Sequence, residues 1–412
     1  MNSILQLKGR FEQRSNRSRP GSPKLPKGKS VSASHLRELE KQLERILVYW
    51  TENKDIRGAL VSVHYKHIVA KSNRLKILLS ENGKSPTESI RGAKFVWEPD
   101  QKGNEVQKHV FTHFVSLQAI EKSIDVLKKT ASIIEQYYKG SVPSEVIEEL
   151  GEKYHFNEVP KTSFLKTVVD GFYVERFDID RATEEITEEA IITIYQTGVD
   201  TKRLLSKFGI DIVDDRIIDG TTLRLNPDEV KLLYNNASYL IAMGVTDFSE
   251  ISRDDVLDAY EDMEEEAGLL IPHPQNEPVI GVIDTQFNEK VYFHEWVEYK
   301  NLLDPNIPLS RKDYEHGTAV SYIIVDGPQG NPELADGCGR FRVRHFGVAT
   351  NNGFSSFTVL KMIRNIVASN RDIKVWNLSL GSKLEIKPNF ISPEAAELDR
   401  IQSEYDVIFV VA

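Results

Sequence analysis

The hydrophobic pattern of the first part of the chain predicts a small α+β domain over residues 34–142. Its first helix begins at Ser34, a residue type favoured as an N-cap, and apolar residues follow at helical spacing. The remaining predicted elements are strands at 59–69, 75–79 and 109–115, and a helix at about 117–138. Strands followed by a helix that covers them are typical of an α+β domain.

A second α+β domain is predicted over residues 143–270. Pro227, followed by Asp228 and Glu229, is typical of a helix N-terminus, where acids are favoured by the helix dipole. The predicted elements are an acidic helical segment at 144–152, a strand at 172–177, a mostly helical stretch at 184–208, a strand at 221–225, a helix at 227–235, a strand at 238–243 and an acidic helix at 249–268. Residues 271–278 are rich in proline, which predicts a linker.

The last third of the chain, residues 279–412, predicts an α/β fold with a parallel sheet and flanking helices. Its first apolar run ends in Asp284, which is typical of a buried strand with an acid at its C-terminal end. Ligands of such sheets bind outside these strand ends, so Asp284 is well placed for chemistry. Further strands are predicted at 341–349 and 373–378 and in the final residues, with a helix at 356–369.

Composition and charge narrow the class of protein. The 412 residues are 40% hydrophobic and 28% charged, which is typical of a globular protein with two or three domains. The formal net charge of −10 argues against nucleic-acid binding, and no apolar run reaches the roughly 18 residues of a membrane span. The single cysteine, Cys338, excludes an internal disulfide, and the N-terminus has no signal-peptide pattern. We therefore expect a cytoplasmic protein.

Two polar features have plain structural interpretations. Residues 1–33 are basic and poor in apolar side chains, which predicts a disordered tail in preference to a nucleic-acid-binding arm. His64, His67, His109 and His113 fall on predicted strands with no cysteine beside them. We interpret them as ordinary strand residues and expect no metal and no other cofactor.

Three motifs follow one another in the last third of the chain. Asp284 ends the first strand, HGT at 316–318 begins 32 residues later, and NLSLG at 377–381 ends a later strand. In this order and spacing they resemble the subtilisin-like serine proteases (subtilases, peptidase family S8), and the resemblance covers roughly residues 276–412. It implies an Asp-His-Ser triad in which Asp284 orients His316 and His316 is the general base.

The resemblance also implies a substrate cleft for a peptide or protein. Six residues match the two edges of that cleft: Gly353, Phe354 and Ser355 on one side, and Ser379, Leu380 and Gly381 on the other. The substrate would bind between the edges as an added strand, held by main-chain hydrogen bonds. Phe354 departs from the small residues usual in the family, and Ser379 belongs to the edge motif and is not the nucleophile.

The nucleophile is not assigned within this chain. The family's oxyanion-hole asparagine and its G-T-S-x-A segment would both lie beyond Ala412, so we expect the chain alone to be a fragment without activity. The alternative is a non-catalytic pseudoprotease or protein-interaction module. A nucleotide-binding fold is excluded, because the sequence has no phosphate-binding glycine-rich loop.

The region before the predicted catalytic domain, about 270 residues long, is expected to regulate or recruit. It resembles the corresponding region of bacterial intracellular proteases of this class that act beside a partner ATPase. The strand–helix–strand pattern at 221–243 resembles the small inhibitory prodomain of the family, and a generic accessory domain fits the same pattern equally well.

Overall fold

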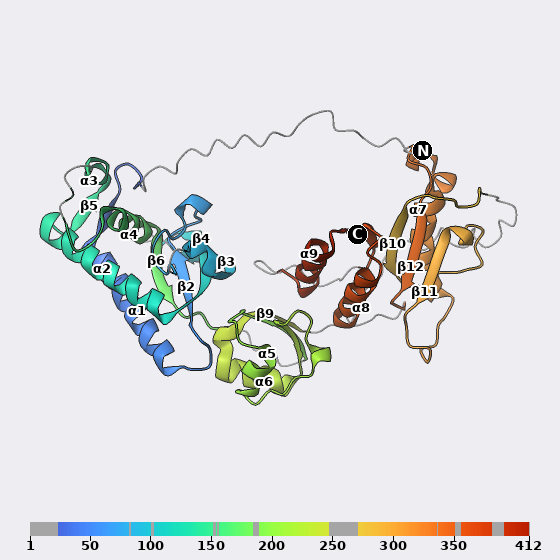
Figure 1. The fold of residues 1–412 in the computed structure, drawn as a ribbon, viewed down its shortest axis with the longest axis horizontal. Helices are drawn as coiled ribbons and strands as arrows, with labels where there is room; N and C mark the ends of the chain where they lie inside the picture. The colour runs from blue at the N-terminus through green and yellow to red at the C-terminus, as the bar shows by residue number, and fades with distance from the viewer. Residues whose placement is uncertain are drawn as a thin grey trace. The chain divides into compact units, whose positions relative to one another are not determined.

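The computed structural model describes residues 24–81, 84–99, 103–150, 154, 156–183, 189–246, 271–335, 337–350, 356–380 and 391–411. Their contacts divide the chain between Val245 and Thr246 into an N-terminal unit and a C-terminal unit (Figure 1). The predicted helix at 249–268 and most of the predicted tail lie outside the described residues. Among the described helices, none has the length and apolar character that crossing a bilayer requires.

The N-terminal unit contains a four-stranded antiparallel sheet in the order β3-β4-β2-β6. The strands are β2 (Ala59–Tyr65), β3 (Ile90–Pro99), β4 (Glu105–Val115) and β6 (Val174–Asp178). The long helices are α1 (Ala33–Glu52), α2 (Leu117–Tyr137) and α4 (Lys161–Tyr173). Helices α1, α2 and α4 pack against one another, and α1 and α4 also contact β6 (Figure 1). The sequence placed the N-cap of α1 at Ser34, but Ser32 holds it, accepting from His35 N at 3.2 Å.

Smaller elements complete the N-terminal unit. Strand β1 (Ser30–Ser32) pairs with β5 (Ser141–Pro143), which is followed by α3 (Ser144–Glu149). A three-stranded sheet has the order β8-β7-β9, with bounds β7 (Ala190–Ile194), β8 (Thr222–Leu225) and β9 (Ile241–Thr246), and carries helices α5 (Thr201–Ser206) and α6 (Pro227–Ala237). One hydrophobic core runs through the unit from Leu25 to Ile241. The division at 142/143 into two domains therefore stays a prediction.

Two further local predictions in this unit are wrong, and one helix was not predicted. Residues 75–79 form no strand, because the backbone N–H groups of 76–78 donate to the carboxylate of Asp170. Of the stretch predicted at 184–208, the structure describes residues 189–208; these are helical only over α5, while β7 supplies a buried strand. The connection before β6 contains helix α4, which the polar residues at its start concealed.

The C-terminal unit is a five-stranded parallel sheet with flanking helices, which confirms the predicted fold class. Its strand order is β11-β12-β10-β13-β14, with bounds β10 (Val279–Asp284), β11 (Val297–Asn301), β12 (Arg342–Gly347), β13 (Val375–Leu378) and β14 (Ile408–Val411). The helices are α7 (Lys312–Gly330), α8 (Ser356–Ser369) and α9 (Pro393–Tyr405) (Figure 1). Strand β11 was missed by the sequence analysis.

Strand β10 lies at the centre of this sheet and determines where Asp284 is placed. Ile283 pairs with Phe346 on one side and with Leu378 on the other. Val282 and Ile283 are fully buried, as a central strand of a covered parallel sheet requires. Asp284, the last residue of β10, therefore stands at the C-terminal edge of the sheet.

Candidate active site

Asp284 and His316 are joined by a short hydrogen bond. Helix α7 begins four residues before His316, and the Nδ1 atom of His316 lies 2.5 Å from Oδ1 of Asp284. An ionised carboxylate oxygen can only accept, so Nδ1 carries the hydrogen and Nε2 carries the lone pair. Asp284 is fully buried, whereas the side chain of His316 is 16% exposed. The pair thus presents a basic nitrogen to the surface and keeps its carboxylate inside.

The hydrogen bonds to Asp284 are concentrated on one oxygen. Oδ1 also accepts from the backbone N–H of Thr285 at 2.6 Å. Oδ2 is buried and accepts no hydrogen bond from any residue that the structure describes. The two donors on Oδ1 fix the orientation of the carboxylate toward His316, which is the role that the resemblance implies for Asp284.

Gly317 and Thr318 explain why the HGT motif needs its second and third residues. A Cβ atom on Gly317 would lie 2.7 Å from the carbonyl oxygens of Thr285 and Gln286, so only glycine lets the helix approach this closely. Thr318 Oγ1 accepts from the backbone N–H of Asn288 at 2.9 Å. Both contacts bind the start of α7 to the loop that follows β10.

Gln286, in the loop that follows β10, holds that loop in place through three hydrogen bonds. Its backbone N–H donates to Asp313 O at 2.9 Å, and its side-chain Nε2 donates to Ala349 O at 3.0 Å. Tyr299 OH donates to Gln286 Oε1 at 2.6 Å. This fully buried amide therefore connects the loop after β10 to the regions around β11, β12 and α7.

His345 is a buried residue of the site that the sequence analysis missed. It lies on β12, opposite Val282, and is fully buried. Its Nε2 is 2.8 Å from Thr285 O, and its Nδ1 is 3.0 Å from Ser321 Oγ. Burial lowers the pKa of His345 below its ordinary value. His345 alternates with Val343 and not with Arg342 and Arg344, and a histidine on the apolar side of the predicted strand was the signal that could have drawn attention to it.

The predicted substrate-binding residues are only partly described. Ser379 and Leu380 directly follow β13 and are half-buried, and Ser379 Oγ donates to Asn377 Oδ1 at 3.0 Å. Gly353, Phe354, Ser355 and Gly381 lie outside the described residues. The two edges of the substrate cleft therefore stay predictions.

Three of the four histidines considered as metal ligands have hydrogen-bond partners within the protein. His64 Nε2 lies 3.1 Å from Asp180 Oδ1, His113 Nδ1 lies 2.8 Å from Ser89 Oγ, and His109 Nδ1 accepts from Val69 N at 3.0 Å. Within the described ranges, no group of three or more histidine, cysteine or acidic residues is arranged to hold a metal ion.

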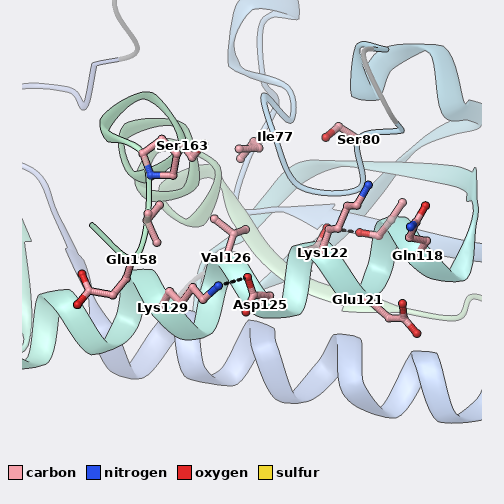
Figure 2. A pocket seen from close by; sticks show the side chains of 14 residues that line it. Ile77, Ser80, Gln118, Glu121, Lys122, Asp125, Val126, Lys129, Glu158 and Ser163 are labelled. Atoms are coloured by element: carbon pink, nitrogen blue, oxygen red, sulfur yellow. Dashed lines mark hydrogen bonds and ion pairs between the residues drawn. The ribbon is translucent and has the colours of Figure 1, made fainter. Parts of the chain in front are cut away.

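A groove of about 640 Å³ lies along α2 in the N-terminal unit (Figure 2). Its lining carries charges of both signs, and Lys129 is paired with Asp125 at 2.6 Å. Serines and lysines line the groove, but Ser123 Oγ donates to Ala119 O at 2.7 Å and Lys129 is held by Asp125, so these two side chains do not form a nucleophile–base pair. It gives no competing candidate for a catalytic centre.

Comparison with known proteins agrees with this geometry. Residues 275–412 match the model of the subtilase family, peptidase S8, so the C-terminal part of the chain is a subtilase domain. No curated protein matches the chain. Among solved structures, the epidermin leader peptide processing serine protease (EpiP) from Staphylococcus aureus is similar at 17% identity and a TM-score of 0.32. That match covers 54% of this chain and 60% of EpiP.

Proposed function

We propose that this chain belongs to a cytosolic serine endopeptidase of the subtilisin type. The observation that carries the proposal is the 2.5 Å hydrogen bond between His316 Nδ1 and the buried carboxylate of Asp284. This bond fixes the tautomer in which Nε2 holds a lone pair, as a general base requires. The family of residues 275–412 supports the same chemistry.

In the proposed reaction His316 first accepts a proton and later donates it. His316 Nε2 takes the proton of a serine hydroxyl while the serine oxygen bonds to the peptide carbonyl carbon. The imidazolium then gives that proton to the leaving amine nitrogen as the peptide C–N bond breaks. A water molecule releases the acyl group by the same steps, and Asp284 stays ionised throughout and stabilises the imidazolium. The serine itself is not assigned among the residues described here.

The substrate in this proposal is an extended segment of a peptide or protein. The position of Ser379 and Leu380 directly after β13 supports binding by strand addition, since both follow a strand next to β10. The N-terminal unit is proposed to regulate the protease or recruit its substrates, and a partner ATPase is the class of protein that would act beside it. The single cysteine, Cys338, allows no internal disulfide, which is compatible with the proposed cytosolic location because disulfides are rare in that compartment.

The test is covalent labelling of the natural gene product with a fluorophosphonate serine probe. Wild type should be labelled, and His316→Ala should lose the label because the serine is then not activated. His273→Ala changes an exposed histidine outside the site and should be labelled like wild type. Labelling that survives in His316→Ala would refute the role of His316.

An unlabelled wild type calls for a second step. The experiment is then repeated after removal of residues 1–270, which tests whether the N-terminal region holds the protease latent. Labelling that appears only in the shortened protein supports an inhibitory role of that region. Labelling in neither form favours a pseudoprotease.

A further inference from the structure

A closed ring of contacts surrounds the residues that directly follow Asp284 and His316. Thr285 Oγ1 accepts from the backbone N–H of Gly317 at 3.0 Å. Ser321 lies one turn further along α7, and His345 contacts both Ser321 Oγ and Thr285 O. Thr285, which follows Asp284, and Gly317, which follows His316, are thus both members of this ring. His345 is the member that β12 contributes.

The hydrogen-bond partners of His345 and its burial together assign its tautomer. Thr285 O is a carbonyl oxygen and can only accept, so Nε2 of His345 must carry a hydrogen. In the neutral ring Nδ1 then holds a lone pair, and the Ser321 hydroxyl must donate to it. Ser321 Oγ also donates to Gly317 O at 2.9 Å, so its one hydrogen is shared between this carbonyl and His345 Nδ1. Burial favours the neutral ring, because it disfavours a charged one.

The ring of His345 also fills the space beside the His316–Gly317 peptide. A Cβ atom on Gly317 would lie 2.8 Å from Cε1 of His345, so the imidazole edge abuts the helix backbone directly. His345 is fully buried, and its ring lies tilted against those of Phe287 and Tyr299, with a centroid separation of 5.7 Å for each pair. It therefore has no freedom to leave this position without disturbing the start of α7.

We infer that His345 is a positioning residue: as the neutral Nε2–H tautomer it bridges Thr285 O and Ser321 Oγ and so keeps His316 at hydrogen-bond distance from Asp284. A leucine at 345 would leave Thr285 O without this donor and Ser321 without this acceptor. A glutamine would restore both, since its amide offers an N–H donor and a carbonyl acceptor. The effect on turnover rests on the proposed function, but the effect on the Asp284–His316 bond does not.

The test is nuclear magnetic resonance of the 412-residue chain with ¹⁵N-labelled histidine. The hydrogen on His316 Nδ1 should give a strongly downfield proton signal, because its bond to Asp284 is short and charge-assisted. The signal is assigned by its absence from His316→Asn. The ¹⁵N shifts of His345 should show one protonated nitrogen, Nε2, and one unprotonated nitrogen, Nδ1. Two protonated nitrogens at neutral pH would overturn the tautomer assignment.

Variants of His345 then distinguish a specific effect on the position of His316 from a general loss of structure. In His345→Leu the downfield signal should disappear or move upfield, whereas His345→Gln should keep it. His113→Leu removes a buried histidine from the N-terminal unit and should leave the signal unchanged. If His345→Leu does not fold, Ser321→Ala takes its place and should weaken the signal. A signal unchanged in a folded His345→Leu, or lost equally in His345→Gln, would overturn the inference.

A kinetic measurement on the natural protein adds a second readout. His345→Leu should lower kcat by up to roughly a hundred-fold with KM unchanged, because a small displacement of His316 affects the reaction more than binding. His345→Gln should recover most of that loss. A natural protein that is inactive both with and without residues 1–270 would refute the proposed function, while the resonance experiment would still decide the role of His345.

Discussion

Trp376 of β13 packs directly on the bare backbone of Gly281 in β10. A Cβ atom placed on Gly281 would overlap the six-membered ring of Trp376, which is fully buried. The two residues are also paired in the parallel register of the sheet. The absence of a side chain at 281 is therefore what lets the indole cover the centre of the strand that carries Asp284.

We expect Gly281→Ala to destabilise the C-terminal unit by roughly 1–3 kcal/mol, because neither the strand nor the buried indole can move aside freely. Chemical unfolding followed by tryptophan fluorescence measures the change. Gly327→Ala is the matched control, since its Cβ would meet the flexible end of Leu334 at 3.2 Å and otherwise make only ordinary contacts with Ile323, at 3.6 Å and beyond. Equal stability of both variants would show that the sheet tolerates a displaced Trp376.

Asp284→Asn should lower kcat by roughly 10⁴-fold in an active form of the protein. The asparagine amide can donate to His316 Nδ1, which favours the wrong tautomer and removes the charge that stabilises the imidazolium. Steady-state hydrolysis of a peptide substrate measures the effect, and KM should change little. Asp304→Asn, at an exposed carboxylate of the same unit, should keep full activity. A loss of less than tenfold in Asp284→Asn would argue against the triad.

The buried His113 should make the N-terminal unit less stable in mild acid. Burial lowers the pKa of His113 to about 3, whereas an unfolded histidine titrates near 6.5. Between these values the unfolded chain binds a proton that the folded chain does not, so stability falls as pH falls through this window. Wild type should lose roughly 1 kcal/mol between about pH 7 and about pH 5.5 through this residue alone.

His113→Asn should lack this acid-dependent loss, because its amide can still donate to Ser89 Oγ but does not titrate. Urea unfolding read by hydrogen exchange of peptides from β4 measures the N-terminal unit by itself. His273→Asn, at an exposed position, should follow the wild-type pH dependence. Parallel behaviour of wild type and His113→Asn would contradict the burial effect.

Glu397 should be a strong contributor to the attachment of α9. Its fully buried carboxylate accepts from Arg364 Nε at 2.6 Å and from Arg400 Nη1 at 3.0 Å. Glu397→Ala should cost roughly 1–3 kcal/mol, since it removes the acceptor from two guanidinium groups. Glu404→Ala removes a second, exposed partner of Arg364 and should leave the free energy of unfolding nearly unchanged. Thermal unfolding of the two variants in parallel gives the comparison.

The sequence alone predicted those features whose signal lies within a few neighbouring residues. Asp284 at the end of an apolar strand and the HGT motif are readable because each lies within a few residues, and the structure brings Asp284 and His316 together. Strand β3 was missed because, as an edge strand, it is largely exposed and lacks a clear apolar alternation.

Other features depend on partners that are distant in the chain. Residues 75–79 are apolar enough for a strand, but their backbone N–H groups donate to the carboxylate of Asp170. No local pattern in the sequence indicates that contact. The role of His345 depends on β12 lying beside β10, which is a property of the sheet order. Such contacts become visible only when the topology is known.

The central position of β10 also determines when the site can exist during folding. Asp284 becomes a buried carboxylate only after β12 and β13, both supplied by much later segments of the chain, have paired on either side of its strand. Pairings between such distant segments form late, because loop closure must precede them. During synthesis His316 therefore leaves the ribosome before β12 and β13 do. The hydrogen bond between Asp284 and His316 can form only once the sheet around β10 has assembled.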